Sequence, residues 1–514
     1  MPNCSDSGSR PPRGCGEPML QHTLVEQLRF NAATFPDRPA LQVVGGAELS
    51  YAEALDRTLV LATAIREHTD GTPVAILQRN SPDAALSFLA CQLAGVAAVP
   101  VNNVLTPTEM DYLLDDSSVG VLLHGPEFTD LVPALSPARK PAVVCSADAG
   151  PSHEPWESFT SSDPAAPFII GYTSGTTGFP KGAVYDGEGM YVQYLRWAVH
   201  FGLGPDSTLL TAGPMFHNSY GGLSLLALAL GATNRIMAVF RPEVAREELG
   251  ARATFAFLVP AMLAQVLRSW RDAGRPPLTA LRRLLSSGSA ADPVALEEAF
   301  EAFPAALITE AYGWSEGGWV THEVKQRGAI VPHSVGEPMV GADVALFDAA
   351  GARCGPGETG EIGVRNVTPF LGYVNPSSPH DTSADGRYLL SGDMGRFGPN
   401  GRLLVVDRKK DIIVTGGENV ASGEVERVLA AHPAVRDVAV VGRPDERWGE
   451  AVTAIVVLEP DAGEVDAHAL RAHCRTMLAA YKVPKQVEFA GALPRNSMGK
   501  VQKFLLRQAP GPAQ

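Results

Sequence analysis

The spacing of apolar and polar side chains predicts alternating helices and strands over the first half of the chain. Apolar positions recur at helical spacing in three segments that open with helix-capping residues, and these predict helices over 50–67, over 81–95 and from residue 106 onward. Short apolar runs predict buried strands at 74–77, 96–101, 119–123, 209–210, 235–239 and 255–259. Strands that alternate with helices in this way are typical of a parallel sheet covered by helices on both faces.

The pattern changes after about residue 335. Short strands separated by glycine-rich turns are expected up to about residue 407. A smaller unit follows, with helices predicted near 423–431 and 466–480 and strands near 438–441 and 452–457. We therefore predict an α/β fold. A large N-terminal domain of helix-covered parallel sheets and a small β-rich section should precede a small α+β domain.

The composition of the chain argues against some classes of binding partner. The 514 residues are 45% hydrophobic and 19% charged, which is typical of a globular protein with more than one domain. A net charge of −14 at pH 7 argues against nucleic acid or an anionic membrane as a partner. The apolar run 86–101 is interrupted by Gly95 and Pro100, so we expect a helix and a strand there and no membrane span. Six cysteines without a Cys-x-x-Cys pair predict reduced thiols in a cytoplasmic protein, and residues 1–20 are predicted to be a disordered tail.

The clearest indication of function is the stretch Tyr172-Thr-Ser-Gly-Thr-Thr-Gly-Phe-Pro-Lys-Gly182. Glycine lets a backbone approach a polyanion, hydroxyl and N–H groups donate to phosphate oxygens, and lysine supplies a positive charge. We predict a phosphate-binding loop formed by Thr173, Ser174, Gly175, Thr176, Thr177 and Lys181. It is not a Walker A loop, because that motif needs Ser or Thr directly after Gly-Lys, and Gly499-Lys500 is followed by Val501.

This stretch and the motifs after it resemble the adenylate-forming enzymes, which include acyl-CoA synthetases, luciferases and the adenylation domains of peptide synthetases. The resemblance covers residues 22–507, and its motifs recur in the family's order. It implies that ATP and Mg²⁺ activate a carboxylic acid to an acyl-adenylate with release of pyrophosphate, and that the acyl group then passes to CoA. It also implies an N-terminal domain over 21–408 and a mobile C-terminal domain over 409–508.

The resemblance assigns roles to individual residues. The nucleotide would be held by the phosphate-binding loop and by Gly288, Ser289, Tyr312, Gly313, Ser315, Asp393 and Arg408. Glu316 and Thr173 would hold Mg²⁺, for which hard oxygen ligands are suited. Lys500 would bridge the carboxylate and the α-phosphate, and His217 would stand at the mouth of the acyl pocket. Because relatives that activate α-amino acids carry Asp at that position, His217 disfavours an α-amino acid and leaves other amino acids open.

The second half-reaction is less clearly specified. Lys410 matches the family's hinge, and Gly416, Gly417 and Glu418 match the acceptor or CoA side. Several positions depart from the family pattern, namely Tyr185-Asp-Gly-Glu188 in place of a Thr-His pair, His333 in place of Gly, and Ser422-Gly423 where Pro is common. An amine or a carrier-protein thiol therefore stays open as the acceptor, as does an unusual acid such as nitrite.

The sequence does not identify the carboxylic acid that would be activated. Gly221 and Gly222 are expected to leave room in the acyl pocket, and Trp319 is expected to shorten it.

Two alternatives from other functional classes are consistent with parts of the chain. Gly313-Trp-Ser-Glu-Gly317 also matches the Gly-x-Ser-x-Gly nucleophile elbow of serine hydrolases. A hydrolase would leave the phosphate-binding loop and Lys500 without a role, and labelling of Ser315 by a fluorophosphonate would favour it. A non-catalytic binding protein on the same fold would need neither Glu316 nor Lys500, and pyrophosphate release with a carboxylic acid excludes it.

Overall fold

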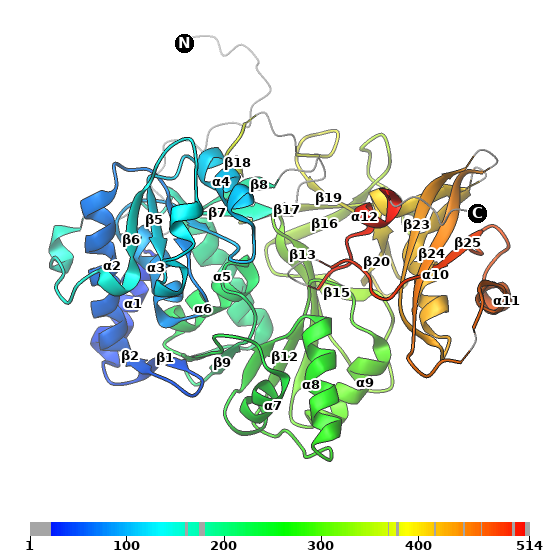
Figure 1. Cartoon of the computed structure of the whole chain (residues 1–514), viewed down its shortest axis with the longest axis horizontal. Coiled ribbons are helices and arrows are strands. Elements are labelled where there is room, and N and C mark those ends of the chain that lie inside the picture. Colours follow the sequence, from blue (N-terminus) through cyan, green and yellow to red (C-terminus); the bar gives the residue numbers. More distant parts are fainter. Residues whose placement is uncertain are drawn as a thin grey trace, which may run out of the picture.

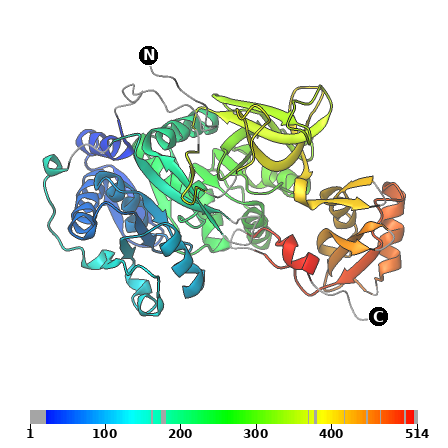
Figure 2. The same ribbon diagram turned by 90° about the horizontal axis from the view of Figure 1, so that it is seen from above.

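The computed structural model describes residues 22–159, 163–173, 180–368, 370–376, 380–415, 418–445, 448–463, 465–495 and 499–508. Within these segments the strands form sheets of seven, thirteen and five strands. The two larger sheets make up most of the molecule, and the five-stranded sheet, coloured orange to red, lies at one end in both views (Figures 1 and 2). The predicted fold class, a large α/β part followed by a small α+β part, is confirmed.

The seven-stranded sheet contains the strands predicted nearest the N-terminus. Its spatial order is β18 (Gly372–Tyr373), β8 (Lys181–Asp186), β7 (Pro167–Thr173), β4 (Ala98–Pro100), β3 (Val74–Leu77), β5 (Val121–His124) and β6 (Ala142–Cys145). The five strands from β7 to β6 are parallel, whereas β8 and β18 pair antiparallel at one edge.

Helices cover both faces of this sheet. They are α1 (Leu24–Thr34), α2 (Tyr51–His68), α3 (Pro82–Leu93) and α4 (Pro107–Asp116), and α2 and α4 begin with the capping boxes expected from the sequence. On β3, Val74 and Ile76 pack in the core shared with α1 to α3, whereas Ala75 and Leu77 pack against α4. Alternate side chains of one strand are therefore buried on opposite faces.

The thirteen-stranded sheet joins a parallel half to an antiparallel half. Its spatial order is β16 (Ala342–Phe347), β17 (Thr359–Asn366), β19 (Leu389–Phe397), β20 (Leu403–Arg408), β15 (Ser334–Pro338), β14 (Gly318–Val324), β13 (Leu307–Trp314), β12 (Arg283–Ser286), β11 (Phe255–Phe257), β9 (Thr208–Thr211), β10 (Thr233–Ile236), β1 (Pro39–Val43) and β2 (Glu48–Ser50). Its helices are α6 (Asn218–Leu230), α7 (Pro242–Ala251), α8 (Pro260–Asp272) and α9 (Pro293–Ala302). Helix α5 (Gly187–Phe201) contacts β7 and β8 of the seven-stranded sheet and packs Trp197 and Phe201 against aromatic residues of the thirteen-stranded one. The change to antiparallel pairing begins at β14, somewhat earlier than the predicted residue 335.

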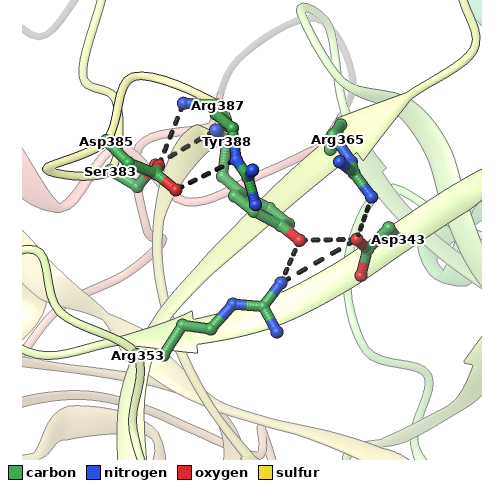
Figure 3. Close-up of polar contacts among 7 residues, drawn as sticks. All are labelled: Asp343, Arg353, Arg365, Ser383, Asp385, Arg387 and Tyr388. Atoms are coloured by element: carbon green, nitrogen blue, oxygen red, sulfur yellow. Dashed lines mark hydrogen bonds and ion pairs between the residues drawn. The ribbon is translucent and has the colours of Figure 1, made fainter.

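A polar cluster fixes the segment that leads into β19 (Figure 3). The hydroxyl of Tyr388 donates to the carboxylate of Asp343 on β16 and accepts a hydrogen bond from Arg353. Arg365 on β17 donates to the same carboxylate at 2.9 Å. The Tyr388 ring is buried, so this cluster anchors the chain shortly before Asp393.

The five-stranded sheet follows a short 3₁₀ turn, η5 (Lys409–Asp411). It consists of β22 (Glu418–Ala421), β21 (Ile412–Thr415), β24 (Gly449–Leu458), β23 (Val435–Asp445) and β25 (Gln486–Phe489). Helices α10 (Ser422–Ala430), α11 (Ala467–Met477) and α12 (Lys503–Gln508) accompany it. Its apolar side chains form clusters of their own. Four further 3₁₀ turns lie earlier in the chain, at η1 (Pro126–Phe128), η2 (Val132–Ala134), η3 (Ser146–Asp148) and η4 (Trp156–Ser158).

The predicted tail, residues 1–20, lies outside the described residues. In the part of the chain that the structure describes, no helix is both long enough and apolar enough to cross a membrane.

Candidate active site

The phosphate-binding loop connects two adjacent strands. β7 ends at Thr173 and β8 begins at Lys181, and these two residues are paired in the antiparallel register. The predicted loop residues Ser174, Gly175, Thr176 and Thr177 lie outside the described residues. The Lys181 ammonium lies 5.0 Å from the centre of the Tyr373 ring on β18. The two ends of the loop are thus held next to each other at one end of the seven-stranded sheet.

Glu316 is held by hydroxyl donors from two other strands. Tyr373 donates to Glu316 Oε1 at 2.8 Å, and Thr173 donates to the same oxygen at 3.2 Å. Burial and the neighbouring carboxylate raise the pKa of Tyr373, so its hydroxyl keeps its proton. The structure therefore brings together the two predicted Mg²⁺ ligands. Tyr373 was missed in the sequence, where nothing in its spacing connects it to Glu316.

The predicted adenosine contacts also come together, across three strands. The hydroxyl of Tyr312 on β13 donates to Asp393 Oδ2 at 2.9 Å. The Nε of Arg408 lies 3.1 Å from Asp393 Oδ1, because β19 and β20 pair these two residues directly. Asp393 is buried, so a carboxylate fixed by two donors stands where the ribose site was predicted.

Two glycines are required beside these residues. Gly288 has φ +94°, in the left-handed region that favours glycine, and it lies with Ser289 in the loop after β12. A Cβ at Gly313 would come within 1.9 Å of the Gly318 carbonyl oxygen, so β13 and β14 approach closely only because residue 313 lacks a side chain. The neighbouring Ser287 hydroxyl donates to the Ala311 carbonyl at 2.6 Å, which ties this loop to β13.

A buried ion-pair network underlies the same loop, and the sequence analysis did not identify it. Glu310 on β13 accepts from the Ala291 N–H at 3.0 Å and pairs with Lys325 at 2.8 Å. Lys325 also pairs with Glu323 at 2.5 Å and donates to the Ser334 carbonyl at 2.7 Å. The Lys325 side chain is only 2% exposed, whereas most lysines are solvated. Sequence alone offers no signal for this burial.

His217 precedes the first residue of α6 and lines a cavity of about 300 Å³. Thr173 and Ser315 line the same cavity, which therefore adjoins the predicted phosphate site. Burial lowers the pKa of His217 to about 4, so the imidazole is neutral at pH 7. Its Nδ1 is enclosed and has no hydrogen-bond partner among the described residues.

The glycines of α6 line the cavity and are also needed for the packing of that helix. Both line the cavity, yet a Cβ at Gly221 would lie 2.5 Å from the Met215 carbonyl oxygen. A Cβ at Gly222 would lie 2.8 Å from the Trp197 ring. Close packing of α6 therefore requires glycine at both positions. Trp319 does not line this cavity and is buried in an aromatic cluster with Trp197, Phe201 and Phe257.

The segment that contains Lys500 lies against the N-terminal part of the molecule. A Cβ built at Gly499 would lie 3.4 Å from the Cβ of Ala261, in the first turn of α8. The residue before α8, Val259, also adjoins Gly288. Lys500 therefore follows a residue that packs close to the predicted adenine loop, although more than two hundred positions separate the two segments in the sequence.

The predicted hinge and acceptor residues are only partly described. Lys410 lies in η5, and Glu418 is the first residue of β22. Gly416 and Gly417 lie outside the described residues. Next to the hinge, Lys409 donates to Glu361 at 2.8 Å, and the other oxygen of Glu361 accepts from the Gly392 N–H at 3.0 Å.

The nucleophile-elbow interpretation of Ser315 is wrong. A nucleophile elbow joins a strand to a helix, whereas Ser315 lies between the antiparallel strands β13 and β14. Its carbonyl oxygen accepts from the hydroxyl of Tyr185 at 2.6 Å. Tyr185 belongs to the segment that departs from the family pattern, so this departure fixes the backbone beside Glu316.

Comparisons with known proteins agree with these features. A sequence model described as "AMP-binding enzyme" matches residues 28–374, and one described as "AMP-binding enzyme C-terminal domain" matches residues 424–500. A feruloyl-CoA synthase from an Amycolatopsis species is 35% identical over 478 residues, which cover 90% of this chain and 94% of that protein. ATP-bound MatB from Rhodopseudomonas palustris is similar in structure, with a TM-score of 0.84, 27% identity and coverage of 95% and 98% of the two chains. The amide bond synthetase McbA from Marinactinospora thermotolerans has a TM-score of 0.83 and 28% identity, with coverage of 94% and 99%.

Proposed function

This chain belongs to the AMP-binding enzyme family, and on that basis we propose that it is an ATP- and Mg²⁺-dependent acid–CoA ligase. A carboxylate oxygen attacks the α-phosphorus of ATP, and the bond from that phosphorus to the bridging oxygen breaks. Pyrophosphate leaves and an acyl-adenylate remains. The CoA thiolate then attacks the acyl carbonyl carbon, AMP leaves, and the product is a thioester.

The first step brings two anions together, so it needs cations and oriented donors. Lys181 and the phosphate-binding loop would contact the β- and γ-phosphates, and Lys500 would bridge the acid and the α-phosphate. Mg²⁺ fits beside Glu316 and Thr173, because their oxygens lie within hydrogen-bond distance of each other and hard oxygen ligands suit this ion. When bound, the ion neutralises charge on the phosphate oxygens.

The observation that best supports this function is the convergence on Glu316. Thr173 from one end of the phosphate-binding loop and Tyr373 from the edge strand donate to the same carboxylate oxygen. The next residue toward the N-terminus, Ser315, lines the cavity with His217. A phosphate site, a metal ligand and an acid-sized cavity thus meet at one place.

CoA is the favoured acceptor. The segment Thr415-Gly-Gly-Glu-Asn-Val420 is closer to CoA-using relatives than to peptide-synthetase domains. An amine is the second candidate, favoured by the likeness to a solved amide bond synthetase. A carrier-protein thiol is the third.

The proposed domain boundary lies between residues 408 and 409, where β20 ends and η5 begins. Cys91, Cys145, Cys354 and Cys474 are free thiols, which supports a cytoplasmic location.

Pyrophosphate release with ATP, Mg²⁺ and a panel of carboxylic acids tests adenylation. Mass spectrometry of the same reactions with CoA, amines or a carrier protein then identifies the acceptor. We expect acid-dependent pyrophosphate release and an acyl-CoA product. No release with any acid would overturn the proposal, and an amide product without a thioester would replace CoA by an amine.

A further inference from the structure

The cavity beside His217 and Ser315 has no charged side chain in its described lining. Apolar groups such as Phe88, Leu113 and Ile169 make up much of its wall. The polar groups are amides and hydroxyls, for example those of Asn102 and Asn218. The loop residues 174–179, which are not described, include no ionisable side chain in the sequence.

The titratable groups in this lining are also neutral at pH 7. Burial lowers the pKa of His217 to about 4, so its imidazole is neutral. Burial raises the pKa of both Tyr172 and Tyr185, so their hydroxyls stay protonated. Behind the wall, Asp116 accepts from the Tyr172 hydroxyl at 2.7 Å and does not itself line the cavity. The wall therefore offers a bound molecule hydrogen bonds and apolar contact but no counter-ion.

The cavity and the adjoining phosphate site differ in the charge of their side chains. Glu316 and Lys181 belong to the phosphate side and are not part of the cavity wall. The one carboxylate that reacts can lie at this boundary, within reach of cations. A second charged group would have to lie in the cavity, where leaving an ion without a partner is strongly unfavourable.

The size of the cavity gives a second restriction. Its volume of about 300 Å³ lies at the lower end of the range for small-molecule sites. At α6 the cavity is bounded by Gly221 and Gly222, which pack closely against Met215 and Trp197.

We propose that the activated acid is a compact monocarboxylic acid whose remaining part is uncharged. This inference rests on the proposed adenylation and specifies the substrate class of the same site. Dicarboxylic acids and amino acids of equal length are excluded by the unpaired charge, and long acyl chains are excluded by size.

The test compares acids that differ in one group. One set is 4-methylbenzoate, terephthalate and 4-(aminomethyl)benzoate, and the other is hexanoate, hexanedioate and 6-aminohexanoate, with hexadecanoate as the long-chain member. Pyrophosphate release is measured with the full-length enzyme at saturating ATP and Mg²⁺. We expect kcat/KM for each charged member to be at least ~100-fold below that of its neutral partner, the scale of a buried unpaired charge. Hexadecanoate should likewise be poor.

A matched pair of variants tests the electrostatic cause. Asn218→Arg places a cation in the wall, and Asn218→Gln changes the same side chain without adding charge. We expect Asn218→Arg to raise kcat/KM for the dicarboxylates about 10-fold over Asn218→Gln, as a charge-assisted hydrogen bond would. Thermal unfolding of both variants confirms that the comparison is made on folded protein.

The outcomes separate this inference from the function on which it rests. A dicarboxylate or amino acid that matches its neutral partner overturns the inference but leaves adenylation intact. Equal dicarboxylate activity in the two Asn218 variants would show that wall charge does not set the preference. Absence of pyrophosphate release with every acid would instead overturn the proposed function.

Discussion

Glu316 owes its position to side chains that are far from it in the sequence. Its Oε1 accepts hydrogen bonds from Tyr373 and Thr173, and Tyr185 holds the backbone of the preceding residue. These contacts restrain the carboxylate, so it would be preorganised for the Mg²⁺ ion that we propose there. Single substitutions at this site distinguish the effect of the Glu316 charge from the effect of its position.

Glu316→Gln keeps the size of the side chain and removes the charge that Mg²⁺ needs. The concentration of Mg²⁺ for half-maximal pyrophosphate release should therefore rise. Tyr373→Phe is the matched control, because it removes a donor to Glu316 while keeping the carboxylate, and it should shift the titration less. An unchanged Mg²⁺ titration with normal turnover in Glu316→Gln would mean that Glu316 is not a metal ligand.

Lys500 should serve the first half-reaction alone. Lys500→Ala is expected to slow acyl-adenylate formation by roughly 10²–10³-fold, the scale for the loss of one well-placed electrostatic group. Transfer from a pre-made acyl-adenylate to CoA should be nearly unaffected. Rapid-quench measurement of each half-reaction distinguishes the two steps. Equal losses in both would assign Lys500 a structural role.

At the level of elements, a buried carboxylate on β13 connects this strand to the segments on either side of it. Glu310 links the loop after β12 to Lys325, just past the end of β14, through one hydrogen bond and one ion pair. The same strand places Tyr312 against Asp393. The position of the predicted adenine loop relative to Tyr312 and Asp393 therefore depends on a buried carboxylate that binds the loop through the Ala291 N–H.

Glu310→Leu should raise the KM for ATP about 10-fold and lower the free energy of unfolding by about 1–3 kcal/mol, because it leaves the Ala291 N–H without its acceptor. Glu310→Gln keeps a carbonyl acceptor and should restore most of the ATP affinity. ATP titrations and denaturant unfolding measure the two effects. A KM for ATP that is the same in both variants would show that Glu310 does not position the loop.

Tyr388→Phe serves as a comparison, because it changes a residue just before β19 of the same sheet that lies outside the site. It removes the hydroxyl that bridges Asp343 and Arg353 (Figure 3). We expect a loss of about 1 kcal/mol in the free energy of unfolding, the typical value for one hydrogen bond. The KM for ATP should stay unchanged, as measured in the same assay. An altered KM would mean that the cluster transmits its effect to Asp393.

On the scale of the whole molecule, contacts hold the five-stranded sheet in one arrangement. Asp407, at the end of the thirteen-stranded sheet, accepts from the Ser422 hydroxyl at 2.8 Å and from the Gly423 N–H at 3.3 Å at the start of α10. Ser422 stands where the family commonly has proline, which has no donor. Gly499 meanwhile packs against Ala261 of α8. This arrangement places the residue before Lys500 next to the first turn of α8.

Lys410→Pro tests whether the molecule pivots at η5. Proline fixes φ near about −65°, a value that suits a 3₁₀ turn, and it also restricts Lys409. The substitution should therefore hold one arrangement, with acyl-adenylate formation kept and CoA thioester formation strongly reduced. Lys410→Ala, which leaves the backbone free, should keep both half-reactions. If Lys410→Pro also keeps both, the hinge lies elsewhere, and if only adenylation is lost, the fixed arrangement is the thioester-forming one.

Local rules account for much of what was predicted. Capping boxes and apolar spacing act over a few residues, so the sequence alone determined most elements and the fold class. The family was predicted from the resemblance of the ordered motifs to the adenylate-forming enzymes. The resemblance also predicted that Tyr312, Asp393 and Arg408 share a site, and the structure brings these three side chains together. Their roles toward the nucleotide stay predictions.

The tertiary structure decided what depends on contacts between distant strands. Tyr373 meets Glu316 only because β18 pairs with β8, and Lys325 is buried only because β13, β14 and β15 lie side by side. Whether an ionisable side chain is solvated, paired or neutral follows from its surroundings and not from its neighbours in the chain. The uncharged wall around His217 arises in this way, since strand register and helix packing set the electrostatics that no local pattern encodes.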